Sequence, residues 1–99
     1  MKLITTYLFS FLLFSPSLVL AGGCDLTKSV YDSKDYAQAY RLANSYKSDG
    51  DACVEYYLAL MYIHGHGVKM DTEKGLRYMN ISADKGYQPA IDFFTKRPT

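Results

Sequence analysis

Apolar residues recur along this chain with a helical period, and no stretch alternates with a period of two for long enough to predict a strand. The pattern predicts clear helices at 35–47, 52–64 and 72–85, a segment of one or two helical turns at 25–31, and a last helix at 89–96. The sequence therefore predicts an all-α fold, with glycine and proline between its elements.

The segment 52–64 differs from its neighbours because its apolar residues surround the helix axis. One stripe has the spacing i, i+4, i+7, i+8 and consists of Val54, Leu58, Met61 and Tyr62. Further apolar residues lie elsewhere around the helix: Tyr56, Leu60 and Ile63. A helix that is apolar on most sides is covered by neighbours on most sides.

The flanking helices are amphipathic, and each has one predicted inner face. In 35–47 this face consists of Ala39, Leu42, Ala43 and Tyr46. In 72–85 it consists of Gly75, Tyr78, Met79, Ser82 and Ala83. Asp51 and Asp71 are suited to cap the helices that follow them, and Gly50 and Gly86 are suited to end the helices that precede them.

The first 21 residues resemble a secretory signal peptide. A positive start at Lys2 is followed by an apolar run and by small residues that fit cleavage after Ala21. The run is short and interrupted by Pro16, which argues against an uncleaved anchor that spans a bilayer of about 30 Å. Cleavage would leave residues 22–99 as one small domain without a membrane span, in the periplasm or outside the cell.

The net charge of the predicted domain limits the kinds of molecule that it is expected to bind. The loss of Lys2 with the signal would leave 10 of the 11 basic residues against 10 acidic ones, so the predicted domain has a formal net charge of zero. It has no basic stripe and no run of like charge, which argues against nucleic acid or an anionic membrane as the partner. Another protein remains as the predicted partner.

The two cysteines, Cys24 and Cys53, both follow the signal. An even count in a small exported chain favours a disulfide, and closing this loop would stabilise the fold by about 3.6 kcal/mol in the chain-entropy model. The alternative is a lipoprotein, because residues 20–24 faintly resemble an acylation box. Acylation of Cys24 would leave Cys53 unpaired.

The chain contains an internal repeat. Four pairs of identical residues are separated by 36 positions: Asp35 and Asp71, Arg41 and Arg77, Asn44 and Asn80, Gly50 and Gly86. Val54 and Ala90 then occupy equivalent small apolar positions. A 36-residue period with two helices in each period is typical of a helical solenoid.

This pattern resembles the consensus of the Sel-1-like repeat family, which is related to tetratricopeptide repeats. The resemblance covers one complete repeat, at about 50–86, and a half repeat on each side. The residues that carry it are Gly50, Asp51, Ala52, Tyr56, Leu58, Leu60, Met61, Tyr62, Gly65, Gly67, Val68, Asp71, Lys74, Tyr78, Ala83, Gly86 and Ala90.

The resemblance implies a short right-handed α-solenoid of antiparallel helix pairs, about two repeats long. It implies that Gly65, Gly67 and Gly86 are structural turn residues, and that 25–31 runs beside 52–64 with the two cysteines at neighbouring ends. Ala59 and Gly75 depart from the usual family residues, but both keep a small side chain where helices approach closely.

Two short motifs suggest chemistry. His64 and His66 could form a metal pair, although zinc sites generally use three or four protein ligands. Ser82 and Lys85 have the serine-x-x-lysine spacing of penicillin-interacting enzymes, and some cysteine-rich Sel-1-like relatives have been described as acting on β-lactams. The companion motifs are absent, so we expect no catalytic, metal or cofactor-binding residue and no cofactor.

The resulting hypothesis is an exported, non-enzymatic protein-interaction module, either an immunity or inhibitor protein or an envelope adaptor. The alternatives are a β-lactam-interacting enzyme and a lipid-anchored envelope protein. We expect tyrosines on the groove and apolar residues at the open carboxyl end to contact a partner protein or a second copy. These candidates are Tyr36, Tyr40, Tyr57, Phe93 and Phe94.

Overall fold

The computed structural model describes residues 22–96, which form five α-helices and no strand. The all-α prediction is therefore confirmed for this part of the chain. The helices are α2 (Gly22–Asp32), α3 (Tyr36–Tyr46), α4 (Ala52–His64), α5 (Thr72–Asp84) and α6 (Gln88–Thr95), with a 3₁₀ turn, η2 (Lys47–Asp49), after α3. The predicted signal segment, 1–21, lies outside the described residues, and none of the helices at 22–96 has the length and apolarity needed to cross a bilayer.

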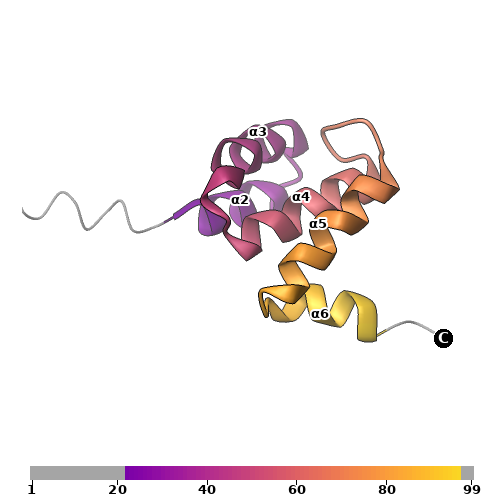
Figure 1. Cartoon of the computed structure of the whole chain (residues 1–99). Coiled ribbons are helices and arrows are strands. Elements are labelled where there is room, and N and C mark those ends of the chain that lie inside the picture. Colours follow the sequence, from indigo (N-terminus) through magenta and orange to yellow (C-terminus); the bar gives the residue numbers. More distant parts are fainter. Residues whose placement is uncertain (1–21, 97–99) are drawn as a thin grey trace, which may run out of the picture.

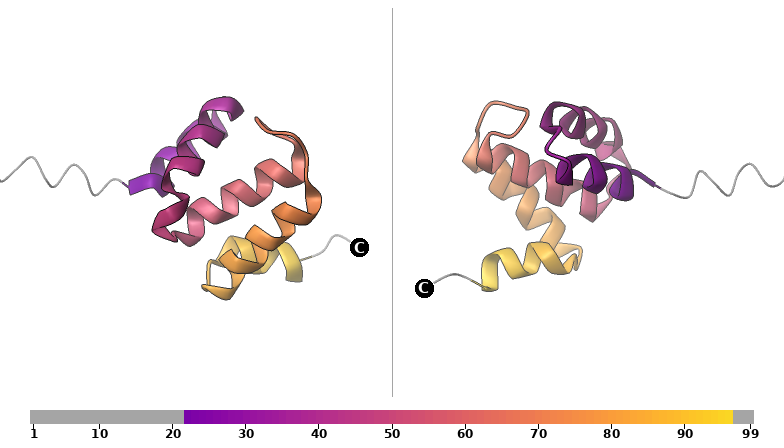
Figure 2. Two further views of the ribbon diagram at one scale, coloured as in Figure 1. Left: turned by 45° about the horizontal axis from the view of Figure 1, so that its top comes forward. Right: turned by 180° about the vertical axis from the view of Figure 1, so that it is seen from behind.

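Helix α4 lies at the centre of the arrangement (Figure 1). The α2–α3 pair lies on one side of α4, and α5 runs along another side in the most extensive helix–helix contact of the described residues. Helix α6 packs on α5 at the end of the molecule away from α3, as both further views show (Figure 2). Each helix thus packs on the helix that follows it in the sequence, and α2 also contacts α4.

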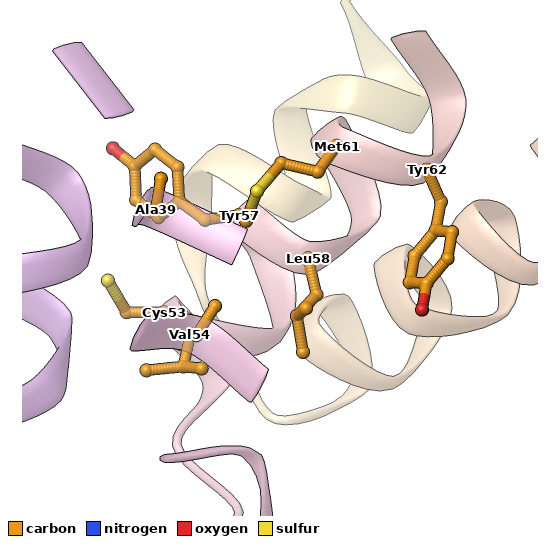
Figure 3. Packing of buried hydrophobic residues seen from close by; sticks show 8 residues of the cluster. Ala39, Cys53, Val54, Tyr57, Leu58, Met61 and Tyr62 are labelled. Atoms are coloured by element: carbon orange, nitrogen blue, oxygen red, sulfur yellow. The ribbon is translucent and has the colours of Figure 1, made fainter. Parts of the chain in front are cut away.

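The main core surrounds α4, as its apolar circumference predicts. Val54, Leu58 and Met61 are at most 1% exposed, and they pack with Ala39 and Ala43 of α3. Figure 3 shows Cys53 and Tyr57 on the side of the purple ribbons of the α2–α3 pair, whereas Tyr62 lies apart from them. The prediction that neighbours cover α4 on most sides is confirmed.

A second core cluster joins α4, α5 and α6 through Ala59, Met79 and Ala90, each of which is fully buried. Close packing here requires a glycine in α5. A Cβ atom on Gly75 would lie 2.7 Å from Cγ1 of Ile63 and 2.9 Å from the carbonyl oxygen of Ala59. The expectation of a small residue at a close helix approach is therefore confirmed at Gly75.

The 36-residue period relates α3 to α5 in the structure as well as in the sequence. Asp35 and Asp71 both cap their helices, and each accepts a hydrogen bond from the backbone N–H three residues later. Both buried residues of α3 have a buried counterpart 36 positions later in α5: Ala39 and Gly75, Ala43 and Met79. Equivalent positions along the two helices therefore face the core.

Helix α2 begins at Gly22, three residues before the predicted start at residue 25. The reason is a close contact that the periodicity does not reveal. Gly23 is buried beneath the ring of Tyr46, and a Cβ atom at this position would lie 2.5 Å from the ring carbon Cγ. The first turn of α2 can therefore pack on α3 because residue 23 has no side chain.

A disulfide joins Cys24 to Cys53, with 5.5 Å between their Cα atoms. Both cysteines lie in first turns, one in α2 and one in α4, so the amino-terminal ends of these helices are neighbours. The predicted pairing is confirmed. A sulfur atom engaged in a disulfide cannot also carry a lipid, so the bonded form is incompatible with the lipoprotein alternative.

We expect the double substitution Cys24→Ala, Cys53→Ala to lower the free energy of unfolding by about 3–4 kcal/mol, because it releases a loop closed across 29 positions. Urea denaturation followed by circular dichroism measures the change. Reductant should destabilise the native protein by a similar amount and leave the double variant unaffected. Equal denaturation midpoints for the oxidised native protein and the double variant would contradict this role.

The turn between α2 and α3 contains a strained residue. Lys34 has a φ of 70°, the only positive φ among the described non-glycine residues, and Gly65 has nearly the same φ, 72°, after α4. Side chains with a Cβ atom are disfavoured in this left-handed conformation by about 1–2 kcal/mol, and helices therefore commonly end on glycine there. The first helix pair thus contains a lysine at a position suited to glycine.

Lys34→Gly should raise the free energy of unfolding by about 0.5–1 kcal/mol because it relieves this strain. The matched control is Lys34→Ala, which removes the same charge but keeps the Cβ atom, and which should give little or no gain. Urea denaturation of the three proteins distinguishes these effects. A gain of the same size in both variants would assign the effect to charge rather than to backbone conformation.

Candidate functional site

Four tyrosine rings form a continuous row across α2, α4 and the turn before α6. In order, ring centroids are separated by 5.2 Å between Tyr31 and Tyr57, 5.1 Å between Tyr57 and Tyr56, and 5.4 Å between Tyr56 and Tyr87. We call these four residues the tyrosine row. It connects elements that are separated by more than fifty positions in the sequence.

The row depends on two consecutive residues of α4. Successive side chains on an α-helix point about 100° apart, so Tyr57 reaches the ring of Tyr31 on α2 while Tyr56 reaches Tyr87 beside α6. Tyr57 is only 7% exposed, whereas Tyr31, Tyr56 and Tyr87 are half-buried. The prediction of Tyr57 as an exposed contact residue is therefore wrong, because α2 covers that side of α4.

Lys28 provides a positive charge close to the row. Burial raises the pKa of the hydroxyl groups of Tyr56, Tyr57 and Tyr87, and the ammonium group of Lys28 opposes that rise in all three. Lys28 also forms an ion pair with Asp32, with 2.9 Å between Nζ and Oδ2. The exposed edge of the row thus combines phenol hydroxyls with one cation and one carboxylate.

The Tyr31 end of the row lies beside the turn after α4. The ring of Tyr36 lies 5.0 Å from that of Tyr31 and stacks on His66 at 4.0 Å with an interplanar angle of 8°. The hydroxyl of Tyr31 lies 3.0 Å from Nδ1 of His66 in a hydrogen bond. His66 therefore anchors the turn to α2 and α3.

The turn glycines have the backbone conformation expected of them. The φ values of Gly65, Gly67 and Gly86 are 72°, 74° and 90°, and a Cβ atom on Gly67 would clash with the backbone carbonyl of Tyr36. His64 is exposed, and its ring lies 5.4 Å from that of His66. Within residues 22–96, no three histidine, cysteine, aspartate or glutamate side chains gather in a group that could hold a metal ion.

A second aromatic group lies between α3, α4 and α5. The hydroxyl groups of Tyr40 and Tyr62 lie 2.9 Å apart in a hydrogen bond, and the rings of Tyr62 and Tyr78 are parallel within 6°. The ammonium group of Lys74 lies 4.9 Å from the ring centroid of Tyr62. Tyr40 is half-buried, so this candidate contributes to packing and keeps part of its surface exposed.

A shallow hollow of about 250 Å³ adjoins this second group. Its lining residues are Lys74, Arg77, Tyr78 and Ile81. All four belong to α5 and follow the spacing i, i+3, i+4, i+7, so they form one stripe along the helix. We call these four residues the basic hollow.

The two phenylalanines at the carboxyl end differ in exposure. Phe93 is 38% exposed, whereas Phe94 is half-buried against the second core cluster. Their ring centroids lie 5.2 Å apart. The expectation of exposed apolar surface at this end holds for Phe93 and only in part for Phe94.

Ser82 and Lys85 have separate packing roles. The hydroxyl of Ser82 is buried and donates a hydrogen bond of 2.6 Å to the carbonyl oxygen of Ala52. Lys85 donates to the carbonyl oxygen of Gly50 at 2.7 Å and pairs with Glu55, at 2.9 Å and 3.0 Å from its two carboxylate oxygens. Both residues thus connect the end of α5 to the start of α4.

Comparison of the chain with protein-family models, with curated proteins and with solved structures finds no match. The geometry of the described residues therefore carries the functional argument. It supplies two surfaces with side chains suited to recognition, the tyrosine row and the basic hollow, on a scaffold closed by a disulfide.

The tyrosine row predicts a loss of stability at alkaline pH. Burial first, and then the neighbouring tyrosines, raise the pKa of Tyr31 from 10.0 to about 12. The folded state keeps this phenol protonated up to a higher pH than the unfolded state does. Its contribution to stability is therefore fully present below pH 10, the unfolded pKa, and is lost as the pH rises from 10 through 12. Ultraviolet titration should show one phenol that ionises last, together with unfolding over that range.

Tyr31→Phe should remove the last phenol from the titration and make the alkaline loss of stability less steep. Tyr46→Phe is the matched control, because it removes a phenol hydroxyl outside the tyrosine row. Ionisation of every tyrosine near pH 10 in the folded native protein would contradict the burial of Tyr31.

Proposed function

We propose that this chain is an exported, non-enzymatic protein-interaction module of the Sel-1-like repeat class, which binds its partner through the tyrosine row. The row itself carries the proposal. The rings of Tyr31, Tyr56 and Tyr87 are half-buried and belong to three elements, and the buried ring of Tyr57 joins Tyr31 to Tyr56. Tyrosine is favoured at protein interfaces because it combines a large apolar ring with a polar hydroxyl group.

Rigidity supports this surface as a binding site. The disulfide fixes the start of α2 against the start of α4, and the contact of Tyr31 with His66 fixes the end of α2 against the turn after α4. The rings on α2 and α4 are therefore ordered before any partner arrives. Binding to such a surface loses less conformational entropy than binding to a mobile one.

Export is supported by the disulfide. Structural disulfides persist in oxidising compartments and are rare in the cytosol. The resemblance of residues 1–21 to a signal peptide points to the same location, so we place the protein in the periplasm or outside the cell. The Sel-1-like assignment is supported by the 36-residue spacing of the capping aspartates and of the buried positions on α3 and α5.

A non-enzymatic role is supported by the positions of Ser82 and Lys85. A nucleophilic serine must reach its substrate, but Ser82 is fully buried and its hydroxyl donates a hydrogen bond to a backbone carbonyl oxygen. Lys85 is held by Glu55 and by the carbonyl oxygen of Gly50. An inhibitor of a secreted protein and an envelope adaptor are the two roles that we consider within this class.

The test is capture of a partner from envelope and culture extracts by the oxidised protein. Tyr56→Ala, Tyr87→Ala should weaken capture of that partner by at least about tenfold, which corresponds to roughly 1.4 kcal/mol. Met70→Ala is the control, because Met70 is 59% exposed in the turn after α4 and is not one of the four residues of the row. Circular dichroism checks that each variant is folded.

The identity of the captured protein separates the two roles, since an inhibitor binds a secreted protein and an adaptor binds an envelope complex. Tyr56→Phe, Tyr87→Phe should retain most of the capture, because the rings remain. Undiminished capture by the folded double alanine variant would overturn the assignment of the tyrosine row as the binding surface.

A further inference from the structure

Two cationic side chains line the basic hollow, and carboxylates of the same chain neutralise little of their charge. Among residues 22–96, Lys74 forms no ion pair, and Arg77 meets only Glu73, at 3.9 Å, with side chains 63% and 88% exposed. An exposed pair at that distance contributes little. The positive charge of Lys74 and Arg77 therefore remains available to an anionic group outside the chain.

A third cation faces the same aromatic group. The hydroxyl group of Tyr40 has a raised pKa because it is hydrogen-bonded to Tyr62, and the charges of Lys47 and Lys74 both oppose that rise. Lys47 of η2 and Lys74 of α5 thus approach one tyrosine from two different elements. Positive charge from two elements therefore acts on this aromatic group, although the predicted domain as a whole has no net charge.

The hollow also contains apolar surface. Ile81 is 43% exposed, although it lies on a helix with a buried inner face, and Tyr78 is half-buried beside it. The volume, about 250 Å³, is below the range of roughly 300–1,000 Å³ that is usual for cavities that enclose small molecules. An open hollow of this size is suited to one side chain of a peptide rather than to a cofactor.

We propose that the basic hollow is a second docking site, which binds an acidic peptide segment of a partner protein. An apolar side chain of the segment packs on Tyr78 and Ile81, and flanking carboxylates pair with Lys74 and Arg77. The guanidinium group can bind a carboxylate through two parallel hydrogen bonds. The site is separate from the tyrosine row and supplies charge recognition that the row lacks.

The probe is a labelled peptide, acetyl-Ser-Glu-Glu-Leu-Glu-Glu-Ser-amide, titrated by fluorescence polarisation. The oxidised native protein should bind it saturably, and affinity should fall as salt is raised. Lys74→Gln, Arg77→Gln should weaken binding at least about tenfold. The matched control, Arg41→Gln, Lys69→Gln, removes two positive charges outside the hollow and should stay within about twofold of the native affinity.

Ile81→Glu is a second variant, which adds a negative charge to an exposed position and should abolish binding while the helical circular dichroism is unchanged. A peptide with glutamine in place of every glutamate should not bind. Three results would overturn the proposal. The glutamine peptide could bind as well as the glutamate peptide, or the variant Lys74→Gln, Arg77→Gln could bind the glutamate peptide with unaltered affinity. The third result is that the protein binds anionic phospholipid vesicles but not the peptide. Tyr56→Ala, Tyr87→Ala should still bind the peptide, so failure at one surface is distinguishable from failure at the other.

Discussion

The structure depends on the need to cover α4 on nearly every side. This helix has apolar residues around its circumference, so no single neighbour can remove it from water. The α2–α3 pair covers one side, and α5 covers another. Because the described helices are short, the disulfide between the first turns of α2 and α4 adds a covalent constraint to this packing.

Close approach of the elements depends on residues that lack a side chain. Gly23 leaves room for the ring of Tyr46, Gly75 leaves room for the backbone of α4, and Gly67 leaves room for the backbone at Tyr36. A Cβ atom at any of these positions would meet a neighbour at less than van der Waals distance. Core packing here therefore relies on small residues as much as on large apolar ones, in agreement with the close packing of protein interiors.

The local features of the fold are predictable from the sequence because each has a local cause. The capping of α4 and α5 follows from Asp51 and Asp71, and the turns follow from glycines with positive φ. The disulfide is predictable because the chain is small and contains two cysteines. The candidate site is less predictable, because it depends on how α2 is rotated against α4.

That rotation decides which aromatic residues are covered and which keep part of their surface exposed. Tyr56 and Tyr57 are adjacent and chemically identical, yet α2 covers only Tyr57. His66 lies in the turn after α4, and its ring stacks on that of Tyr36, thirty positions earlier. Tyr87 belongs to the tyrosine row only because the side chain of Tyr56 points toward it. Periodicity shows which face of a helix is apolar, but it does not show which neighbour covers that face.

The two candidate surfaces are anchored on different sides of the same helix. Tyr56 of the tyrosine row and Tyr62 beneath Lys74 are six residues apart on α4, which places them about 120° apart around the helix axis. A partner that binds the tyrosine row as proposed would contact Tyr31, Tyr56 and Tyr87 from three separate segments, a surface that a linear peptide cut from this chain does not reproduce. Recognition through the row therefore requires the folded, oxidised protein. The basic hollow differs, because a single helix supplies its four lining residues.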